Sequence, residues 1–248
     1  MENTFLVGLS QQLASTRAME VIANNLANLS TPAFKREGVD FQQYVMALPA
    51  TEAEGGATVD VSFVLDQGIT RDLSNGRLEQ TGGLLDVALT GPGYFVVQTP
   101  NGERYTRNGH FTLDDQGQVV TDEGYQVQSD GGGITLQPQD GDLHIAADGT
   151  LSTSLQLLGK LRVVTFADER ALKKAGTSLY DAAGQTAQAA DAVRVRQGTV
   201  ERSNVEPVIE IAHMIDVLRA YQASVELTKS GEDLLKSTIE KLGAVPTA

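Results

Sequence analysis

The 248-residue sequence contains no cysteine and no tryptophan, and it contains only three histidines. Without cysteine the chain forms no disulfide bond and offers no thiolate ligand to a metal. A cysteine-free chain also suits a protein that passes from a reducing to an oxidising compartment. The histidines, His110, His144 and His213, are too far apart to match a metal-ligand spacing.

The motifs of common catalytic sites are absent as well. The Gly131-Gly132-Gly133 run is not followed by Lys-Ser/Thr and is therefore not a phosphate-binding loop, and no serine lies in a nucleophile elbow. Four acidic residues lie in turn-like segments without the spacing of a calcium loop: Asp114, Asp115, Asp122 and Glu123. We therefore expect the protein not to be an enzyme, and to bind no cofactor and no metal.

Long apolar runs and basic residues are both scarce. No run approaches the 18 residues of a membrane-spanning helix, and the polar opening Met1-Glu2-Asn3 does not resemble a secretory signal. This predicts a cytoplasmic protein, or one exported without a cleaved signal. The formal net charge is −13, and residues 45–200 hold 20 acids against 11 bases. Such an acidic body argues against nucleic acid as a partner and favours solubility.

The C-terminal end carries a long apolar pattern with alternating steps of three and four residues. Its positions are Ile211, Met214, Leu218, Tyr221, Val225, Thr228, Glu232, Leu235, Ile239 and Leu242. This spacing predicts a helix of about 38 residues, which Ser203 and Glu206 cap and whose first turn contains Pro207. A second apolar line follows Val208, Ile211, Ile215 and Leu218. Two apolar lines on one helix require two or more neighbours.

The N-terminal end repeats this spacing and is the best candidate for a partner helix. Its positions are Leu6, Leu9, Leu13 and Thr16, followed after one extra step of three by Met19, Ile22, Leu26 and Leu29. We expect this helix to end before Thr31-Pro32, because a residue that precedes proline avoids helical angles. Three asparagines, Asn24, Asn25 and Asn28, favour side-chain hydrogen bonds between packed helices, with a solvated face as the alternative.

Between the two helices, short apolar runs alternate with turn dipeptides. Asn101-Gly102 and Asn108-Gly109 are each flanked by strand-forming residues and predict two hairpins. The stretch 48–60 has few bulky apolar residues and is interpreted as a flexible connection.

The predicted fold class is therefore α+β. Long N- and C-terminal helices pair as a coiled-coil-like bundle, and a mainly antiparallel β-domain is inserted between them. We expect a discontinuous helical assembly domain at 1–32 and 203–248, a connector at 33–60 and a β-rich body at 61–202.

Three parts of the sequence resemble the signatures of bacterial flagellar rod and hook proteins. They are Ala23 to Lys35 near the N-terminus, Leu85 to Phe95 with Tyr105 to Phe111 in the centre, and Gly198 to Val205 with Met214-Ile215 and Arg219 to Ala223 near the C-terminus. The resemblance covers nearly the whole chain. The chain length and the short connector resemble the proximal rod type, and a distal rod or hook subunit is the alternative.

One position departs from the family pattern. The family usually has glycine where this chain has Ala33. Alanine tolerates a positive backbone φ poorly, so the departure argues against a positive φ at this position.

The resemblance implies a structural subunit without a catalytic site. Members of the family are exported through the flagellar type III apparatus without a cleaved signal and polymerise helically across the periplasm. Their terminal helices line the channel of a hollow shaft that transmits torque. The implied partners are other copies, other rod proteins of the proximal and distal rod, the export apparatus and the surrounding basal-body rings.

We expect the assembly interface to lie on the two terminal helices. Its residues are Leu6, Leu9, Leu13, Met19, Ile22, Asn24, Leu26, Asn28, Ile211, Met214, Ile215, Leu218, Tyr221, Val225, Leu235, Ile239 and Leu242. A monomer offers too little partner surface for all of them, so we predict that the termini fold on assembly. The alternative from another class is a soluble coiled-coil binding module, in which the C-terminal seam is intramolecular.

Overall fold

The computed structural model describes residues 2–49, 58–137, 139–190 and 192–243. The chain divides into two compact units. The helical unit comprises residues 1–27, 37–71 and 206–248, and the body unit comprises residues 28–36 and 72–205. The predicted combination of two terminal helices with an antiparallel β-domain is confirmed.

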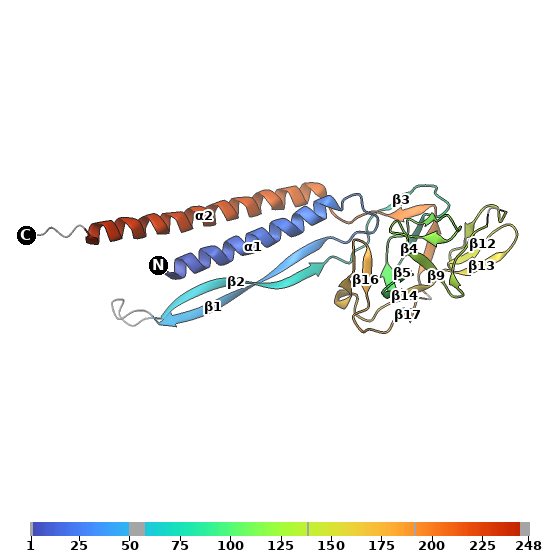
Figure 1. Ribbon diagram of the computed structural model, residues 1–248, viewed down its shortest axis with the longest axis horizontal. Coiled ribbons are helices and arrows are strands. Elements are labelled where there is room, and N and C mark those ends of the chain that lie inside the picture. Colours follow the sequence, from blue (N-terminus) through green and yellow to red (C-terminus); the bar gives the residue numbers. More distant parts are fainter. Residues whose placement is uncertain (1, 50–57, 138, 191, 244–248) are drawn as a thin grey trace, which may run out of the picture. The chain divides into compact units, whose positions relative to one another are not determined.

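The described residues of the helical unit form two helices and one long hairpin. Helix α1 (Glu2–Ala27) and helix α2 (Pro207–Gly243) run antiparallel. Strand β1 (Glu37–Pro49) pairs with strand β2 (Thr58–Arg71), and the hairpin packs against α1 (Figure 1). A two-stranded ribbon of this length is marginal by itself, so its packing on the helix stabilises it. None of the described helices is long and apolar enough to cross a membrane.

The boundaries of the units differ from those we predicted. Residues 37–49 and 58–71 are strands of the helical unit, whereas we expected a connector followed by the start of the body. Residues 50–57 of the predicted flexible connection lie outside the described residues. Helix α1 ends at Ala27, four residues before Thr31, because the chain turns where the Thr31 amide donates to the Asn28 carbonyl at 3.2 Å.

The body unit is built from antiparallel strands. Its main sheet has the order β15-β16-β6-β5-β9-β8-β7, with β10, β14 and β17 attached. These strands are β5 (Tyr94–Thr99), β6 (Gly102–Thr106), β7 (Thr112–Leu113), β8 (Val119–Val120), β9 (Gln126–Ser129), β10 (Gly132–Gly133), β14 (Val163–Thr165), β15 (Lys173–Lys174), β16 (Leu179–Asp181) and β17 (Gln188–Ala189).

Among the described residues, three smaller sheets and the 3₁₀ helix η2 complete the body. One sheet joins β11, β12 and β13, the second joins β18 to β4, and the third joins β19 to β3. The bounds are β3 (Leu78–Gln80), β4 (Val87–Thr90), β11 (His144–Ile145), β12 (Thr150–Ser152), β13 (Leu157–Lys160), β18 (Arg194–Gln197), β19 (Thr199–Glu201) and the 3₁₀ helix η2 (Glu169–Ala171). The chain thus returns at β18 and β19 to pair with strands near the start of the body.

Strand β5 separates two hydrophobic cores. Phe95 and Val97 point into the larger core, while Tyr94 and Val96 point into the smaller one, and all four are buried. Side chains alternate between the two faces of a strand, so a continuous apolar run indicates a strand buried on both faces. This explains why Tyr94 to Val97 lacks the usual polar alternation.

Only one of the two predicted Asn-Gly hairpins is present. Asn101-Gly102 joins β5 to β6 as expected. Asn108-Gly109 does not form a hairpin, because Gly109 lies directly against the start of β4. Its carbonyl accepts from the Val87 amide at 2.8 Å, and a Cβ at Gly109 would lie 1.7 Å from the Val87 carbonyl oxygen. The glycine serves this close approach and not a turn.

Candidate assembly interface and junction cluster

The surfaces where α1 and α2 meet carry small and polar residues. The Ser224 hydroxyl donates to the Gly8 carbonyl at 2.9 Å, and the Gln12 amide donates to the Thr228 hydroxyl at 3.2 Å. A Cβ at Gly8 would lie 2.6 Å from the Thr228 Oγ1. Glycine at this position therefore lets the two helices approach closely.

The face that α2 turns toward α1 shares Met214, Tyr221 and Thr228 with the predicted apolar seam but differs from it at the other positions. Between Glu210 and Gly231, the less exposed positions of α2 are Glu210, Met214, Val217, Tyr221, Ser224, Thr228 and Gly231. They also follow steps of four and three, but their side chains are small, polar or only partly apolar. Two sets of positions on α2 therefore follow the same spacing. The set with small side chains faces α1, because small side chains let the helices pack closely.

One buried polar group joins three elements of the helical unit. The Asn25 side-chain amide donates to the Glu37 carbonyl of β1 at 2.7 Å and to the Glu210 carboxylate of α2 at 3.1 Å, and its oxygen accepts from the Glu37 amide at 2.9 Å. Asn25 and Glu210 are both fully buried. We did not place Asn25 among the interface residues, although the three clustered asparagines were a signal for such a contact.

Most of the predicted interface residues are exposed within the chain. On α1 the exposed residues are Leu6, Leu9 and Leu13, at 43–64% of their full accessible area. On α2 they are Ile211, Ile215, Leu218, Val225, Leu235 and Ile239, at 39–67%. Val208 on the second predicted apolar line is 79% exposed. These apolar residues therefore face away from the contact between α1 and α2.

The remaining predicted residues lie closer to the contacts inside the helical unit. Ile22 is buried, and Met19, Leu26, Met214 and Tyr221 are half-buried. Asn24 is exposed, and the Asn28 side chain belongs to the turn after α1, where its oxygen accepts from the Thr31 hydroxyl at 3.0 Å. Leu242 belongs to α2, but its side chain lies outside the described residues.

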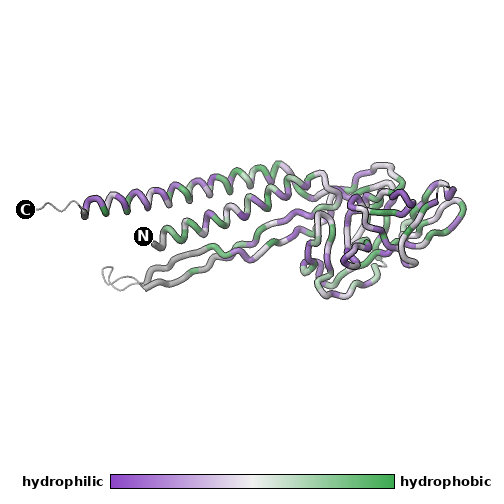
Figure 2. Tube along the Cα trace, in the orientation of Figure 1, coloured by the Kyte–Doolittle hydropathy of each residue, from purple (hydrophilic) through white to green (hydrophobic). Residues whose placement is uncertain are grey.

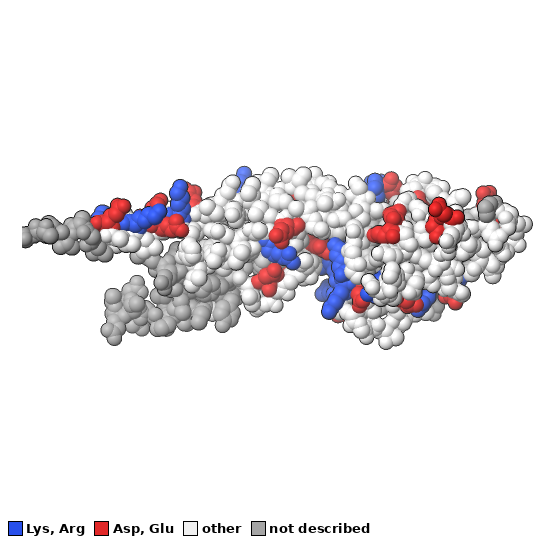
Figure 3. Space-filling model, viewed as in Figure 1, with Lys and Arg blue, Asp and Glu red and all other residues white. Residues whose placement is uncertain are grey.

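Charge divides α2 into two halves. Residues 207–225 contain three Asp, Glu, Lys or Arg residues, namely Glu210, Asp216 and Arg219, whereas residues 226–243 contain seven. Figure 2 shows more apolar residues along the N-terminal half of α2, and Figure 3 shows charged side chains gathered over its C-terminal half. The N-terminal half of α2 thus carries few charges, and its apolar side chains are exposed in the single chain.

A second feature of interest is a buried charged cluster in the body unit, which we call the junction cluster. The Glu201 carboxylate accepts from Lys35 Nζ at 2.7 Å and from Arg107 Nε at 2.9 Å. The Glu201, Arg107 and Lys35 side chains are 2%, 4% and 5% exposed. Each of the three segments that carry the family resemblance supplies one member of this cluster.

Backbone groups and one amide complete the junction cluster. The Gly76 amide donates to the Glu201 carboxylate at 2.9 Å, and Lys35 Nζ donates to the Ser74 carbonyl at 2.7 Å. The Arg107 guanidinium also donates to the Asn75 side chain at 2.9 Å. The sequence did not predict this cluster, because its members are up to 166 residues apart in the chain.

The pKa values in the cluster follow from burial and from the neighbouring charges. Burial acts to raise the pKa of Glu201, but the charges of Arg107 and Lys35 outweigh it and lower the pKa below 4.5. Burial lowers the pKa of Lys35 from 10.5, although the Glu201 carboxylate opposes this change. The cluster thus holds two cations and one anion in a dry environment.

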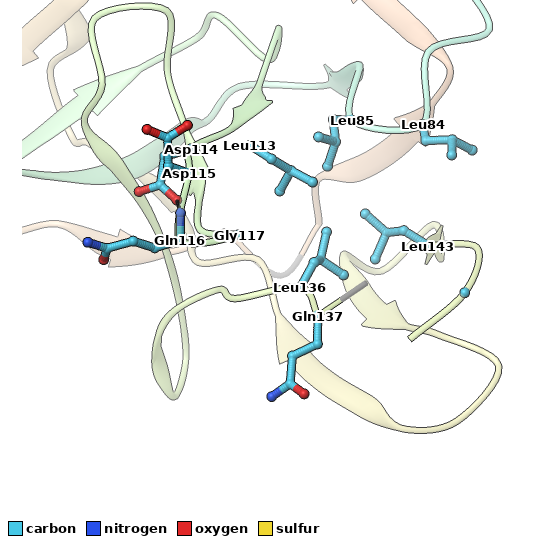
Figure 4. A pocket seen from close by; sticks show the side chains of 11 residues that line it. Leu84, Leu85, Leu113, Asp114, Asp115, Gln116, Gly117, Leu136, Gln137 and Leu143 are labelled. Atoms are coloured by element: carbon cyan, nitrogen blue, oxygen red, sulfur yellow. Dashed lines mark hydrogen bonds between the residues drawn. The ribbon is translucent and has the colours of Figure 1, made fainter. Parts of the chain in front are cut away.

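The body also contains a hollow of about 550 Å³ that is lined mainly by leucines. Figure 4 shows the side chains of Leu84, Leu85, Leu113, Leu136 and Leu143 around this hollow. Asp114 and Asp115 belong to the same lining. Within the described residues, no group of three or more histidines and carboxylates could hold a metal ion.

The chain combines two long terminal helices, whose apolar faces are exposed, with an antiparallel β-domain. Three family descriptions match the chain: "Flagella basal body rod protein" at residues 5–35, "Flagellar hook protein FlgE/F/G D1 domain" at 88–153 and "Flagellar basal body rod FlgEFG protein C-terminal" at 196–241. The chain belongs to the family of flagellar basal-body rod proteins.

Full-length relatives point to one type within this family. The chain is 38% identical to "Flagellar basal-body rod protein FlgF" of Caulobacter vibrioides over 99% of this chain and 100% of that relative. It is 32% identical to the FlgF protein of Mesorhizobium japonicum over 98% and 99%. It is also 32% identical to the FlgG protein of Buchnera aphidicola subsp. Schizaphis graminum, over 88% and 91%.

These similarities establish a basal-body rod protein of the FlgF type. The protein is a structural rod subunit of the flagellar basal body and not an enzyme. Family membership implies assembly with other flagellar rod components.

The structure also bears on the departure at Ala33. Ala33 has a φ of +55°, so alanine adopts here the left-handed conformation that glycine prefers. The expectation that alanine would exclude a positive φ was wrong. The Ala33 amide donates to the Glu201 carbonyl at 2.8 Å, and this bond helps to hold the turn.

Proposed function

We propose that the chain polymerises helically through the exposed apolar faces of α1 and α2, and that the resulting hollow shaft transmits torque and conducts exported subunits. The observation that supports this proposal is the orientation of the terminal helices. Most of their leucines and isoleucines are exposed, while small and polar residues lie in the contact within the chain. An exposed apolar stripe of this extent marks a protein interface.

The energetics favour burial against neighbouring copies. Burial of apolar surface contributes about 25 cal/mol per Å², and ordering the backbone of each residue costs about 1–2 kcal/mol. Within the chain, α1 and α2 bury few large apolar side chains on each other, so little offsets this entropy. The terminal helices therefore become ordered when other copies cover their outer faces, as expected for folding coupled to assembly.

The geometry of a repeating contact determines the form of the assembly. The open stripe of α1 includes Leu9, and the open stripe of α2 includes Ile215; these are different surfaces of one chain. When one surface of a copy binds a different surface of the next copy, the contact is head-to-tail and gives a helical filament unless it closes into a ring. This form agrees with a rod.

The location and the other partners belong to the same proposal. We place the rod segment across the periplasm, reached through the flagellar type III export apparatus without a cleaved signal. The neighbours in this arrangement are other rod proteins along the axis and the basal-body rings around it. The similarity to FlgG keeps a distal position as the second candidate, and a map of the basal body with side chains would distinguish the two.

The test of the proposal places a charge on the exposed helix face. Ile215→Lys introduces a cation at a residue that is 46% exposed in the single chain. We expect the body unit to unfold at the same temperature as in the wild type, and the variant chain to be missing from purified basal bodies. Cells that depend on it would not swim.

The matched control is Leu155→Lys in the body unit. Leu155 is 69% exposed and lies outside the proposed interface. The substitution therefore makes the same change in charge at an exposed residue that the interface does not use. We expect this variant to enter basal bodies like the wild type. Normal incorporation of Ile215→Lys would contradict the proposed role of the helix faces.

A further inference from the structure

The chain passes between its two units at four places. These crossings follow Ala27, Arg36, Arg71 and Val205. Strand β1 begins at Glu37, directly after the second crossing, and β2 ends at Arg71, directly before the third. Helix α2 begins at Pro207, two residues after Val205. The second, third and fourth crossings therefore lie at or within two residues of regular elements.

A single side chain binds the body-side ends of three crossings. The Asn204 side-chain oxygen accepts from the Arg36 amide at 2.7 Å. Its side-chain amide donates to the Asp72 carbonyl at 3.0 Å and to the Ser74 carbonyl at 3.1 Å. The Asp72 amide also donates to the Arg36 carbonyl at 2.9 Å. Arg36, Asp72 and Asn204 are thus joined at one point of the body unit.

The segment that follows the first crossing is held at the same point. The Asn204 amide donates to the Phe34 carbonyl at 3.3 Å, and Ala33 is bonded to the backbone of Glu201. The junction cluster lies alongside, because Lys35 and Asn204 both donate to the Ser74 carbonyl. Every crossing therefore ends at a segment that hydrogen bonds to residues 201–204.

We infer that Asn204 is the positioning residue that gathers the four crossings on the body, so that load on the body reaches the helical unit through all of them together. This inference rests on the proposed torque-transmitting function. Chain segments that share a set of hydrogen bonds at one point bear a pulling force together. Segments without such bonds extend one after another. Asn204 suits this task because a single side-chain amide both donates and accepts.

The first test measures the clamp in the isolated chain by amide hydrogen exchange. In Asn204→Ala, the Arg36 amide loses its acceptor, and we expect its exchange to accelerate roughly three- to tenfold, the effect of losing one hydrogen bond. Exchange at the Asp72 amide, which donates to the Arg36 carbonyl, should rise with it because the two segments are no longer held together. The buried amides of β5 serve as an internal reference and should not change. Asn204→Asp keeps an acceptor for the Arg36 amide but loses the donors to the Asp72 and Ser74 carbonyls, so the Arg36 amide should exchange more slowly in this variant than in Asn204→Ala.

The second test measures load in cells. We expect basal bodies to contain Asn204→Ala at wild-type levels, while swimming speed falls more steeply than in the wild type as the viscosity of the medium rises. The matched control is Asn101→Ala, at the exposed turn between β5 and β6, which should behave as the wild type in both tests.

The outcomes separate this inference from the proposed function. Unchanged exchange at Arg36 and Asp72 would show that Asn204 does not clamp the crossings. Faster exchange with normal swimming under load would show that the clamp does not serve force transmission. If the wild-type chain itself were missing from basal bodies, the proposed function would fail, whereas the exchange result would still report on the clamp.

Discussion

Replacing Glu201 by glutamine tests the electrostatic account of the junction cluster directly. Glutamine has nearly the same shape, but it removes the carboxylate that accepts from both Lys35 and Arg107. Its amide nitrogen then faces one of these two donors, with which it cannot form a hydrogen bond. The side chains of all three residues are at most 5% exposed, so water cannot replace the lost interaction.

The expected cost is large compared with the stability of a domain. Removing one partner of a buried ion pair costs about 3–5 kcal/mol, and domains are stable by about 5–15 kcal/mol. Lys35→Met should cost less, because burial already disfavours the charge of Lys35 and the pair of Arg107 with Glu201 remains. The double variant Glu201→Gln/Lys35→Met should be more stable than Glu201→Gln alone, because it removes one of the two cations that the loss of Glu201 leaves without a partner.

The pH dependence has a definite sign. Because the folded pKa of Glu201 is lowered from 4.5, the unfolded chain binds more protons below that pH, and stability falls as the pH drops through the folded pKa. The lowered pKa of Lys35 means that stability rises as the pH increases toward 10.5. Glu201→Gln removes the contribution of Glu201 to the acid branch, so its stability should fall less steeply below pH 4.5.

The assay uses the natural fluorophores of the body. The chain has no tryptophan, and the buried Tyr94, Tyr105 and Tyr180 of the smaller core report on the body unit. Urea unfolding followed by tyrosine fluorescence gives the free energy of unfolding for each variant. A loss below about 1 kcal/mol in Glu201→Gln, or a double variant no more stable than this single one, would refute the assignment of a charge-coupled buried cluster.

Two further predictions concern backbone positions. Gly8→Leu should weaken the pairing of α1 with α2 by about 1–3 kcal/mol, because even a Cβ would lie 2.6 Å from Thr228 Oγ1; circular dichroism of assembled material measures the loss. Its control is Gly231→Ala, where nothing lies within 4 Å of the new Cβ and helix propensity predicts a gain of about 1 kcal/mol. Ala33→Gly should change the stability of the body by less than about 1 kcal/mol, because relief of the left-handed strain offsets the loss of a buried methyl group and the greater freedom of glycine when unfolded. A loss above about 2 kcal/mol in urea unfolding would show that Ala33 is not strained.

The sequence predicted the helices well and their contact poorly. Steps of three and four placed both helices to within a few residues, because that period follows from helix geometry. The same period fits the outer stripe with Ile211 and the inner stripe with Ser224, and local pattern does not show which of them meets α1. The choice depends on how closely the backbones approach at Gly8, which is a tertiary property.

Other features were missed for related reasons. The β1–β2 hairpin was missed although Phe41, Tyr44 and Phe63 are good strand formers, because the alanine- and glycine-rich stretch 50–57 hides the pairing of the two strands. Packing on α1 then adds to the stability of the pair. The junction cluster required three distant segments to meet. Lys35, Arg107 and Glu201 each lie in a stretch that resembles the family, but a resemblance in sequence does not state which residues touch.

The return of the chain at β18 and β19 affects the timing of folding. Strands β3 and β4, at residues 78–90, find their partners only at residues 194–201. Pairings so distant along the chain form slowly, because a long loop must close first. The body therefore stays incomplete until four-fifths of the polypeptide has left the ribosome. Until then, β3 and β4 remain without the strands that pair with them in the folded body.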